Sequence, residues 1–264
     1  MENNLLLGQH FLINEKVLDE LIKLSAITKT DNILEIGAGN GIVSKRIAPL
    51  CNHLDIVEID TNLKKYLNDL PKVYKNVSII YQNALNYNFS NYNKIITSLP
   101  YNILEPFLYK CIKYKVPYIV MLIGDKYALS LQNFGKTNSI NFIQLLSKTF
   151  FNCHIGSFVD KNSFNPPPRT GSYIVKLEAK TIFSDLEFVV AEIFKQSDKK
   201  IKTSLKESLI RLYASKNNIL TQKQAKVIIA NMNIDENILN CFLSNLTNEQ
   251  LCILYNKIKA HMNI

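Results

Sequence analysis

A four-residue segment, Ser98-Leu99-Pro100-Tyr101, carries side chains that suit chemistry on a planar amine. The exocyclic amine of a nucleobase is a poor nucleophile because its lone pair is conjugated with the ring. The Ser98 side chain and the Leu99 carbonyl can accept the two amine hydrogens and help to localise that lone pair toward an electrophilic methyl group. Pro100 stiffens the turn, and Tyr101 can stack on an extruded base. The alternative is a proline turn that ends a strand, with Tyr101 packed as core.

The run Glu35-Ile36-Gly37-Ala38-Gly39-Asn40-Gly41 is a second candidate site. Glycine lets the backbone turn tightly and lets a ligand approach the main chain closely. The spacing is G-x-G-x-G, not the G-x-G-x-x-G of dinucleotide-binding folds, and an acidic residue precedes it. We therefore expect a nucleoside ligand without phosphate, whose charged methionine moiety lies against the loop. The alternative is an ordinary tight turn.

Two polar residues follow the next predicted strands and suit the rest of such a ligand. Glu58 ends the second strand about 20 residues after the glycine loop, where a carboxylate can accept hydrogen bonds from both hydroxyls of an adenosine ribose. Asn83 follows the third strand, where its amide can bond an adenine edge. Together with the glycine loop they predict a nucleoside-cofactor site.

Short apolar strands alternate with helices through much of the chain. This pattern predicts an α/β fold with a mostly parallel sheet covered by helices on both faces. The carboxyl ends of parallel strands share one edge, which would position the candidate residues together. Strands are expected near 33–34, 54–59, 77–81, 94–97 and 118–123. Helices are expected at 14–27 with Asn14 as N-cap, at 42–50, from a Thr61 cap to Leu70, and at 103–114.

The pattern changes in the last third of the chain. The β-like stretches Phe150–Val159 and Ser172–Leu177 predict an antiparallel pair at the sheet edge. Beyond Ala179, helical periodicity recurs around 186–194, 201–213, 221–229 and 248–258. We therefore predict an α/β domain over 1–180 and a small helical domain over 181–264.

The composition indicates a partner class and excludes others. The chain has 31 Lys and Arg against 22 Asp and Glu, a net charge of +9, which favours a polyanion such as nucleic acid. An AT-rich genome would produce a similar excess of lysine. No apolar run reaches the roughly 20 residues of a membrane helix, and no signal peptide is visible, so we expect a cytoplasmic protein. The scattered cysteines and histidines predict no metal site, and we expect a monomer.

Six motifs together resemble the ribosomal RNA adenine dimethyltransferases, and the sequence looks like the small-subunit branch. Along the chain they are Gly8-Gln9-His10-Phe11-Leu12, Glu35 to Gly41, Glu58-Ile59-Asp60, Gln82-Asn83-Ala84, Ser98 to Tyr101, and Phe164-Asn165-Pro166-Pro167-Pro168-Arg169. The likeness covers nearly the whole chain. It implies a Rossmann-like domain that uses S-adenosylmethionine to convert two adjacent adenines, in the hairpin near the 3′ end of small-subunit ribosomal RNA, to N6,N6-dimethyladenine.

The resemblance also implies roles for individual residues. Tyr101 and Phe164 would sandwich the flipped base, with Ser98 at the transferring methyl group. Without the family, Phe164 is an apolar plug beneath the proline loop. The segment Phe194–Leu205 is similar to the basic helix of the family's C-terminal domain, which implies RNA contacts by Lys199, Lys200 and Lys202. The implied cofactor contacts are His10, Leu12, Gly37, Gly39, Glu58, Asn83 and Ser98.

The sequence departs from the family pattern near the target-binding face. The family usually has Asn where this chain has Ser98, and Asp where it has Asn83. The segments Ile123–Lys126 and Thr170–Ser172 also differ, and the usual basic N-terminal arm is missing. Three functions therefore stay open: the small-subunit dimethyltransferase, an erythromycin-resistance-type enzyme acting on large-subunit RNA, and a noncatalytic nucleic-acid-binding assembly or transcription factor on the same scaffold.

Overall fold

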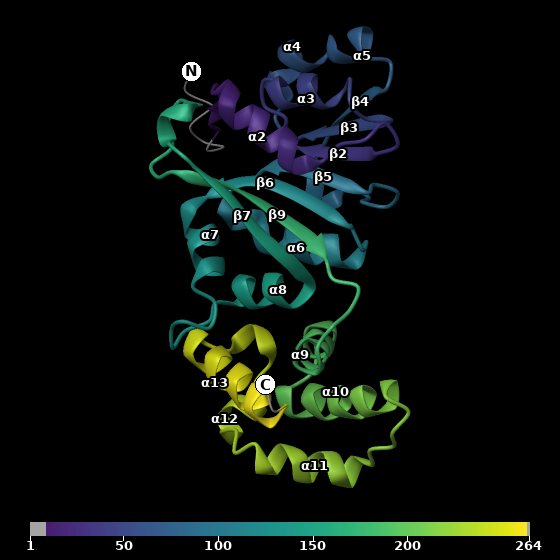
Figure 1. Ribbon diagram of the computed structural model, residues 1–264, viewed down its shortest axis with the longest axis vertical. Helices are drawn as coiled ribbons and strands as arrows, with labels where there is room; N and C mark the ends of the chain where they lie inside the picture. The colour runs from purple at the N-terminus through teal and green to yellow at the C-terminus, as the bar shows by residue number, and fades with distance from the viewer. Residues whose placement is uncertain (1–8, 263–264) are drawn as a thin grey trace. The chain divides into compact units, whose positions relative to one another are not determined.

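A computed structural model describes residues 9–262 of the 264-residue chain (Figure 1). Gly8, which opens the N-terminal motif, lies outside the described residues. The chain divides into two compact units. The first contains the chain up to Gln132 together with Asn152–Ala179, and the second contains Asn133–Phe151 and the chain from Lys180 onward.

The first unit is built on a seven-stranded sheet with the order β4-β3-β2-β5-β6-β9-β7. Strands β2 to β6 run parallel, and β9 runs antiparallel to β6. The strands are β2 Asn32–Ile36, β3 His53–Glu58, β4 Val77–Tyr81, β5 Lys94–Ser98, β6 Tyr118–Gly124, β7 Phe151–Val159 and β9 Ser172–Ala179. The predicted α/β class is confirmed, and the two predicted late strands are neighbours, with β7 at the edge.

Helices cover both faces of this sheet because its central strands are apolar on both sides (Figure 1). Ile33 and Ile56 belong to the core cluster that includes Leu18 and Leu21 of α2. Alternate strand residues such as Leu34 point to the other face and are equally buried. The helices of this unit are α2 Glu15–Ser25, α3 Ile42–Ile47, α4 Lys64–Leu67, α5 Leu70–Val73, α6 Leu104–Lys113 and α7 Asp125–Gln132.

Local signals set most of the helix starts. The Asn14 side chain accepts hydrogen bonds from two backbone N–H groups of the first turn of α2, which confirms the predicted cap. The single helix predicted after a Thr61 cap is wrong. Asp60 caps a short 3-10 turn, and separate helices α4 and α5 follow. Pro71 lies at the start of α5, and a proline disfavours a continuous helix because it lacks the backbone N–H and its ring clashes with the preceding turn.

The second unit is mainly helical. Its helices are α8 Phe142–Phe150, α9 Asp185–Lys195, α10 Ile201–Ser215, α11 Gln222–Asn231, α12 Glu236–Leu239 and α13 Asn248–His261. The sequence analysis predicted no helix at α7, α8 or α12. Although α8 precedes residue 180, it groups with the second unit, because the rings of Phe142 and Phe150 pack 5.2 Å and 6.0 Å from the Phe194 ring of α9.

Candidate active site

Three of the predicted segments meet at the carboxyl edge of the sheet. The glycine loop follows β2, Glu58 ends β3 and Ser98 ends β5, and β2 lies between the other two strands. The Gly37 N–H donates to the Val57 carbonyl at 2.9 Å. On its other side, a Cβ atom added to Gly37 would lie 3.4 Å from the Ser98 carbonyl oxygen. The sheet therefore brings the loop, the acid and the tetrapeptide together.

The glycine loop uses backbone conformations that other residues rarely adopt. The φ angles are +73° at Gly37, +59° at Gly39 and +77° at Gly41. A Cβ on Gly39 would also lie 3.0 Å from a ring carbon of Phe11. A larger residue at position 39 would be strained and would displace the aromatic ring that lies against the loop.

Glu58 joins the glycine loop to the end of β3. Its side chain is buried, and Oε2 accepts a hydrogen bond from the Gly39 N–H at 3.1 Å. Oε1 accepts from the backbone N–H groups of Ile59 at 2.9 Å and Asp60 at 3.0 Å. Backbone donors on both oxygens fix the orientation of the carboxylate beside the loop.

Glu35 is a buried acid that the sequence analysis only noted as preceding the loop. It lies on β2 and is 2% exposed. Burial raises the pKa of Glu35 to about 8, and the negative charge of Glu58 adds to this rise. The Ser44 hydroxyl interacts with the Glu35 carboxyl group and opposes this rise in pKa, although the rise is larger. Among the described residues, Gln9 Oε1 is a buried side-chain oxygen that has no hydrogen-bond partner. Such atoms are rare in folded proteins and indicate a place where a polar ligand or water would bind.

The tetrapeptide presents an open surface at the end of β5. Ser98 and Pro100 are exposed, Leu99 is buried, and Tyr101 is 44% exposed. A 3-10 turn, Tyr101–Ile103, leads from it into α6. An exposed serine followed by a half-exposed ring can meet a base, and the ring is not packed as core.

Asn83 lies at the end of β4 and is exposed. Its side-chain oxygen accepts a hydrogen bond from the Leu85 N–H at 2.9 Å and so caps the 3-10 turn Ala84–Asn86. The preceding residue, Gln82, donates its N–H to the Glu58 carbonyl at 3.0 Å. This hydrogen bond ties the Asn83 turn to the strand end that carries Glu58.

The N-terminal motif pairs with the proline loop. Strand β1 (Phe11–Leu12) runs antiparallel to β8 (Phe164–Asn165), with Leu12 opposite Phe164. Both side chains are buried, at 6% and 5% exposure. His10 is exposed, and its Nδ1 lies 2.8 Å from the Pro166 carbonyl oxygen. In this structure Phe164 is packed as the plug alternative describes, and stacking on a base would require its ring to be uncovered.

Gln9 and Asp60 belong to two of the sequence motifs, but the sequence analysis assigned neither of them a role. Gln9 Nε2 donates to Asp60 Oδ2 at 2.9 Å, across 51 positions of sequence. Asp60 is 6% exposed, and its Oδ1 accepts from the Asn62 N–H. Their positions in the motifs that contain His10 and Glu58 were the sequence signal that could have indicated a role for them.

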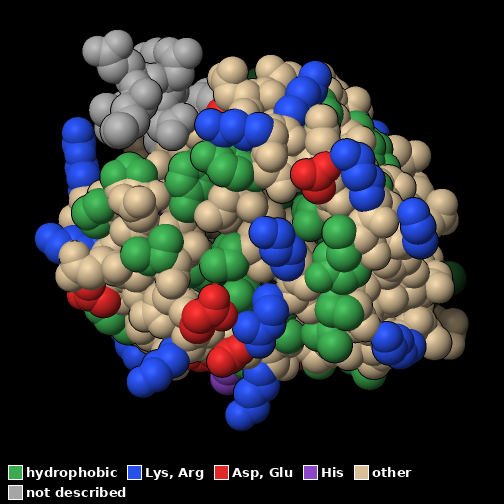
Figure 2. All heavy atoms as spheres, turned by 90° about the horizontal axis from the view of Figure 1, so that it is seen from above, with side chains coloured by type: hydrophobic (Ala, Val, Ile, Leu, Met, Phe, Trp, Pro, Cys, Tyr) green, Lys and Arg blue, Asp and Glu red, His purple; other side chains and the backbone are tan. Residues whose placement is uncertain are grey.

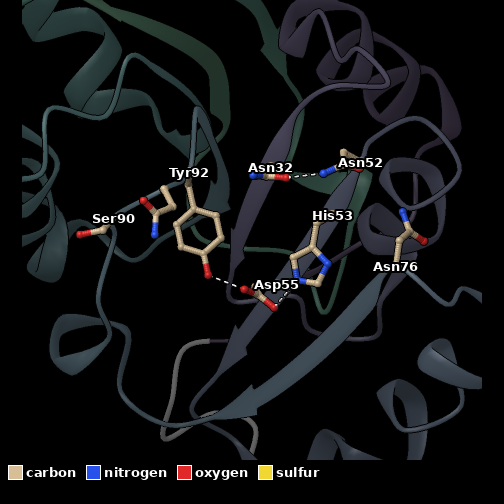
Figure 3. Close-up of a pocket in the computed structure, with 8 residues that line it drawn as sticks. Asn32, Asn52, His53, Asp55, Asn76, Ser90 and Tyr92 are labelled. Atoms are coloured by element: carbon tan, nitrogen blue, oxygen red, sulfur yellow. Dashed lines mark hydrogen bonds and ion pairs between the residues drawn. The ribbon is translucent and has the colours of Figure 1, made fainter.

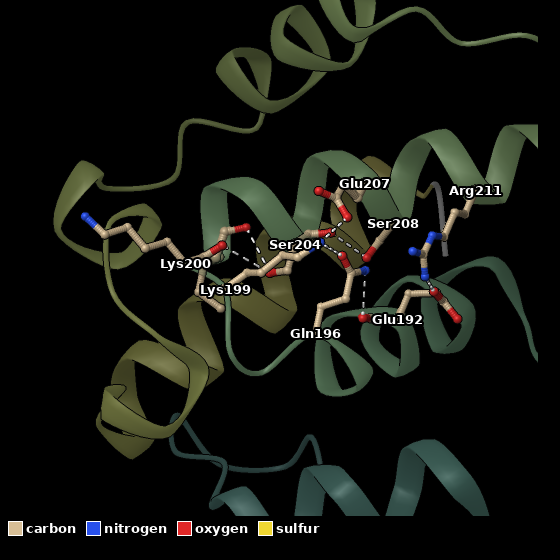
Figure 4. A network of polar contacts seen from close by, with 9 residues as sticks. Glu192, Gln196, Lys199, Lys200, Ser204, Glu207, Ser208 and Arg211 are labelled. Carbon is tan, nitrogen blue, oxygen red and sulfur yellow. Dashed lines mark hydrogen bonds and ion pairs between the residues drawn. The ribbon is translucent and has the colours of Figure 1, made fainter.

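The three lysines of the predicted RNA contact differ in their surroundings, and Figure 4 shows two of them, Lys199 and Lys200. The segment Phe194–Leu205 is not one basic helix, because α9 ends at Lys195 and α10 begins at Ile201. Lys199 Nζ lies 2.6 Å from Glu207 Oε2, and Lys202 Nζ lies 3.2 Å from Glu236. Lys200 is exposed at the N-cap of α10, and its side chain extends away from this network. Of the three lysines, Lys200 has the positive charge that acidic side chains neutralise least.

The opposite, amino edge of the sheet carries an open hollow of about 510 Å³ (Figure 3). It is lined by Asn32, Asn52, His53, Asp55, Asn76, Ser90, Asn91 and Tyr92. Asp55 accepts hydrogen bonds there from Tyr87 and Tyr92 and lies 3.0 Å from the His53 ring. Because Asp55 already has partners and the candidate motifs lie at the other edge, we assign the hollow no ligand.

Within residues 9–262, no cluster of three or more His, Cys, Asp or Glu side chains is arranged to hold a metal ion. In the same range, every helix is too short or too polar to cross a membrane.

The sheet order and the glycine loop between Glu58 and Ser98 define a Rossmann-like methyltransferase fold. Solved structures show the same fold. A dimethyladenosine transferase from Plasmodium falciparum superposes with a TM-score of 0.63 at 22% identity, covering 95% of this chain and 98% of that one. The 23S rRNA methyltransferase ErmE gives 0.60 at 16% identity, covering 94% and 99%.

Sequence comparison narrows this class to one family. The model of the ribosomal RNA adenine dimethylases matches residues 1–242, and the chain belongs to this family. It is 29% identical to a probable ribosomal RNA small subunit methyltransferase A of Methanococcus maripaludis, covering 81% of this chain and 83% of the relative. A protein of Methanosarcina acetivorans with the same name is 27% identical, with coverage of 95% and 91%.

Proposed function

We propose that this protein uses S-adenosylmethionine to convert two adjacent adenines in the 3′-terminal hairpin of small-subunit ribosomal RNA to N6,N6-dimethyladenine. The family and the names of the archaeal relatives support this substrate. The observation that carries the proposal is the apposition of the Ser98 main chain and Gly37 at one edge of the sheet. Methyl transfer requires the cofactor and the target base to be held in contact. Here the glycine loop, which suits the cofactor, lies next to the tetrapeptide, which suits the target base.

The residues around the glycine loop fit the cofactor. The unpartnered buried oxygen of Gln9 belongs to the N-terminal segment beside the loop, and a polar ligand would satisfy such an atom. Glycine at position 39 keeps the main chain open to close approach. We assign the ribose hydroxyls to Glu58, and the remaining cofactor contacts to His10, Leu12, Gly37, Gly39, Asn83 and Ser98.

The target adenine would meet the Ser98–Tyr101 segment. When bound, the cofactor supplies an electrophilic methyl group. The Ser98 hydroxyl and the Leu99 carbonyl accept the N–H groups of the adenine amine and orient its lone pair, while the half-exposed Tyr101 ring stacks on the base. The amine can release its proton after attack, so the site needs no strong general base. Phe164 would cover the second face of the base once its ring is uncovered.

RNA binding would involve the positive charge of both parts of the chain. Basic side chains are spread over the face seen in Figure 2, with fewer acidic ones between them. We propose that the helical region 181–264 contributes through Lys200, with smaller contributions from Lys199 and Lys202 because acidic residues neutralise them. RNA affinity should fall steeply with rising salt, because phosphate contacts release counterions.

The test is mass spectrometry of ribosomal RNA fragments after incubation of the protein with S-adenosylmethionine and separated, undermethylated small and large subunits. We expect dimethyladenine in the small-subunit 3′ hairpin with the wild-type protein and none with Ser98→Ala. Methylation confined to the large subunit would favour the resistance-type enzyme. RNA binding without transfer to either subunit would favour the noncatalytic factor.

The proposal also implies a cellular role. A protein that modifies small-subunit RNA would act during ribosome assembly, and we propose that it does so as a cytoplasmic monomer. Light scattering of the purified protein, with and without small subunits, measures the mass of the free and the bound species. A free species of 30.2 kDa is the expected result.

A further inference from the structure

The N-terminal segment Gln9–Asn14, which we name the strap, contacts parts of the site that are far apart in the sequence. At its start, Gln9 Nε2 donates to Asp60 Oδ2 at 2.9 Å. In its middle, the Phe11 ring lies so close to Gly39 that an added Cβ would come within 3.0 Å of it. The strap therefore touches both the end of β3 and the glycine loop.

The second half of the strap is bound to the segment that carries Phe164. Besides the two pairs of the β1–β8 ladder, the Ile13 N–H donates to the Ser163 carbonyl at 2.9 Å. Asn14 Nδ2 donates to Ser163 Oγ at 3.1 Å. The His10 ring nitrogen donates to the Pro166 carbonyl at 2.8 Å, since a carbonyl oxygen can only accept. These contacts run along one side of residues 163–166.

A continuous chain of hydrogen bonds leads from the candidate ribose site to the strap. Glu58 Oε1 accepts from the Asp60 N–H at 3.0 Å, and the Asp60 carboxylate accepts from Gln9. Gln9 Oε1 is buried and has no partner among the described residues. A ligand that binds Glu58 and the glycine loop would therefore act on the orientation of Asp60, Gln9 and the Phe11 ring.

We propose that the strap couples the two ligand sites, so that an occupied cofactor site orders residues 163–166 and raises the affinity for target RNA. Gln9 is the positioning residue of this coupling. The inference rests on the proposed function, since it takes the glycine loop as the cofactor site and Phe164 as part of the base site. The β1–β8 ladder has only two residue pairs, so its order depends on the contacts at its ends.

The coupling has a thermodynamic consequence. Binding of either ligand requires free energy to order the strap. Once one ligand has ordered it, the other binds with less of this cost, so each ligand raises the affinity of the other by the same factor. We expect S-adenosylhomocysteine to increase the affinity for a small-subunit 3′ hairpin RNA about fivefold or more, the usual lower bound for such coupling. Gln9→Ala should bring this factor to near one, whereas Asp60→Asn, which keeps an oxygen acceptor for Gln9, should retain most of it.

The direct test is hydrogen exchange of the full-length protein with and without saturating S-adenosylhomocysteine. We expect added protection at the amides of Ile13, Phe164 and Asn165 in the wild-type protein. Gln9→Ala should bind the ligand more weakly, as calorimetry measures, and at saturating ligand it should lack that added protection. Asn91→Ala, at the amino edge of the sheet, is the matched control and should behave as the wild type does.

The outcomes separate the coupling from the proposed function. Failure of the wild-type protein to bind S-adenosylhomocysteine would overturn both. Binding without a change in exchange at residues 163–165 would overturn the coupling alone. A coupling factor that is unchanged in Gln9→Ala would also overturn it, because the strap contact would then be only structural. The melting temperature of each variant shows whether it is folded.

Discussion

Buried carboxyl groups at the two edges of the sheet have pKa values shifted in opposite directions. At the amino edge, Asp31 accepts a hydrogen bond from the Thr28 N–H at 2.6 Å and lies 2.8 Å from Lys94 Nζ. Burial by itself raises the pKa of Asp31, but the hydrogen bond and charge of Lys94 outweigh it and hold the pKa below its ordinary value. At the carboxyl edge, burial and the charge of Glu58 outweigh a hydrogen bond from Ser44 and raise the pKa of Glu35 to about 8.

The second pair of acids differs in the kind of partner. Asp55 at the amino edge is held by side chains, including Tyr92 and the His53 ring. Glu58 at the carboxyl edge is held by backbone N–H groups beside the glycine loop. The hollow lies at the amino edge, whereas the candidate motifs lie at the carboxyl edge, so cavity volume and functional chemistry point to different places. We infer that acids held by side chains and cations stabilise the fold, and that the edge where the backbone holds Glu58 is the one prepared for ligands.

The largest expected effect is a pH dependence that comes from Glu35. In the unfolded chain this carboxyl group ionises near its ordinary pKa of 4.5, whereas the folded protein holds the proton to about pH 8. The free energy of unfolding should therefore fall as pH rises between these values, by up to about 4 kcal/mol from pH 5 to pH 8. Glu35→Gln should remove this fall, as urea unfolding across that range measures.

Asp31→Asn is the comparison at the amino edge. Because the pKa of Asp31 is lowered in the folded state, its contribution is present above the ordinary pKa and is lost as pH falls through the folded value. The variant should therefore lose stability at neutral pH, where the wild type keeps the ionised pair with Lys94. Equal pH profiles for the Glu35 and Asp31 variants would contradict the contrast between the edges.

Gly39→Val should abolish most of the cofactor affinity. A β-branched residue at a φ of +59° is strained, and its side chain would overlap the Phe11 ring. Left-handed strain and overpacking together amount to about 3 kcal/mol, or roughly a hundredfold in affinity measured by calorimetry. Gly135→Val is the control, because Gly135 has a φ of +74° in open space. It should lower stability slightly and leave cofactor affinity unchanged.

Glu58→Gln should weaken cofactor binding by about ten- to a hundredfold, because hydrogen bonds to a charged group contribute about 1.5–3 kcal/mol. The matched change at the other edge is Asp55→Asn. It should lower the free energy of unfolding by about 1–3 kcal/mol, since it disturbs the half-buried network with Tyr92, and leave cofactor affinity as it is. A loss of affinity in the Asp55 variant would show that the two edges are not independent.

Tyr101→Ala should lower kcat/KM for RNA by roughly tenfold and leave cofactor affinity unchanged, because one stacked base contributes about 1–3 kcal/mol. Tyr66 on α4 is 46% exposed, against 44% for Tyr101, and lies outside the tetrapeptide. Tyr66→Ala therefore controls for the loss of an exposed ring. Equal activity of the two variants in a methyl-transfer assay would remove Tyr101 from the base site.

Much of the first unit was predictable because its signals are local. The strand predicted at 77–81 coincides with β4, and Asn14 caps α2. Apolar periodicity, N-caps and glycine turns act within a few residues, so they can be identified without knowledge of the rest of the chain. The same local view missed α8 and joined α4 to α5, because it gave no weight to Pro71 or to aromatic packing on Phe194.

The sequence by itself determined the α/β class, the motif order and the residue types available for chemistry, since these follow from short-range pattern and composition. Tertiary structure decided which of those residues meet and which are neutralised. The contact of Gln9 with Asp60 and the ion pair of Lys202 with Glu236 join positions 51 and 34 residues apart. Such contacts depend on strand order and helix packing, and therefore on the whole fold.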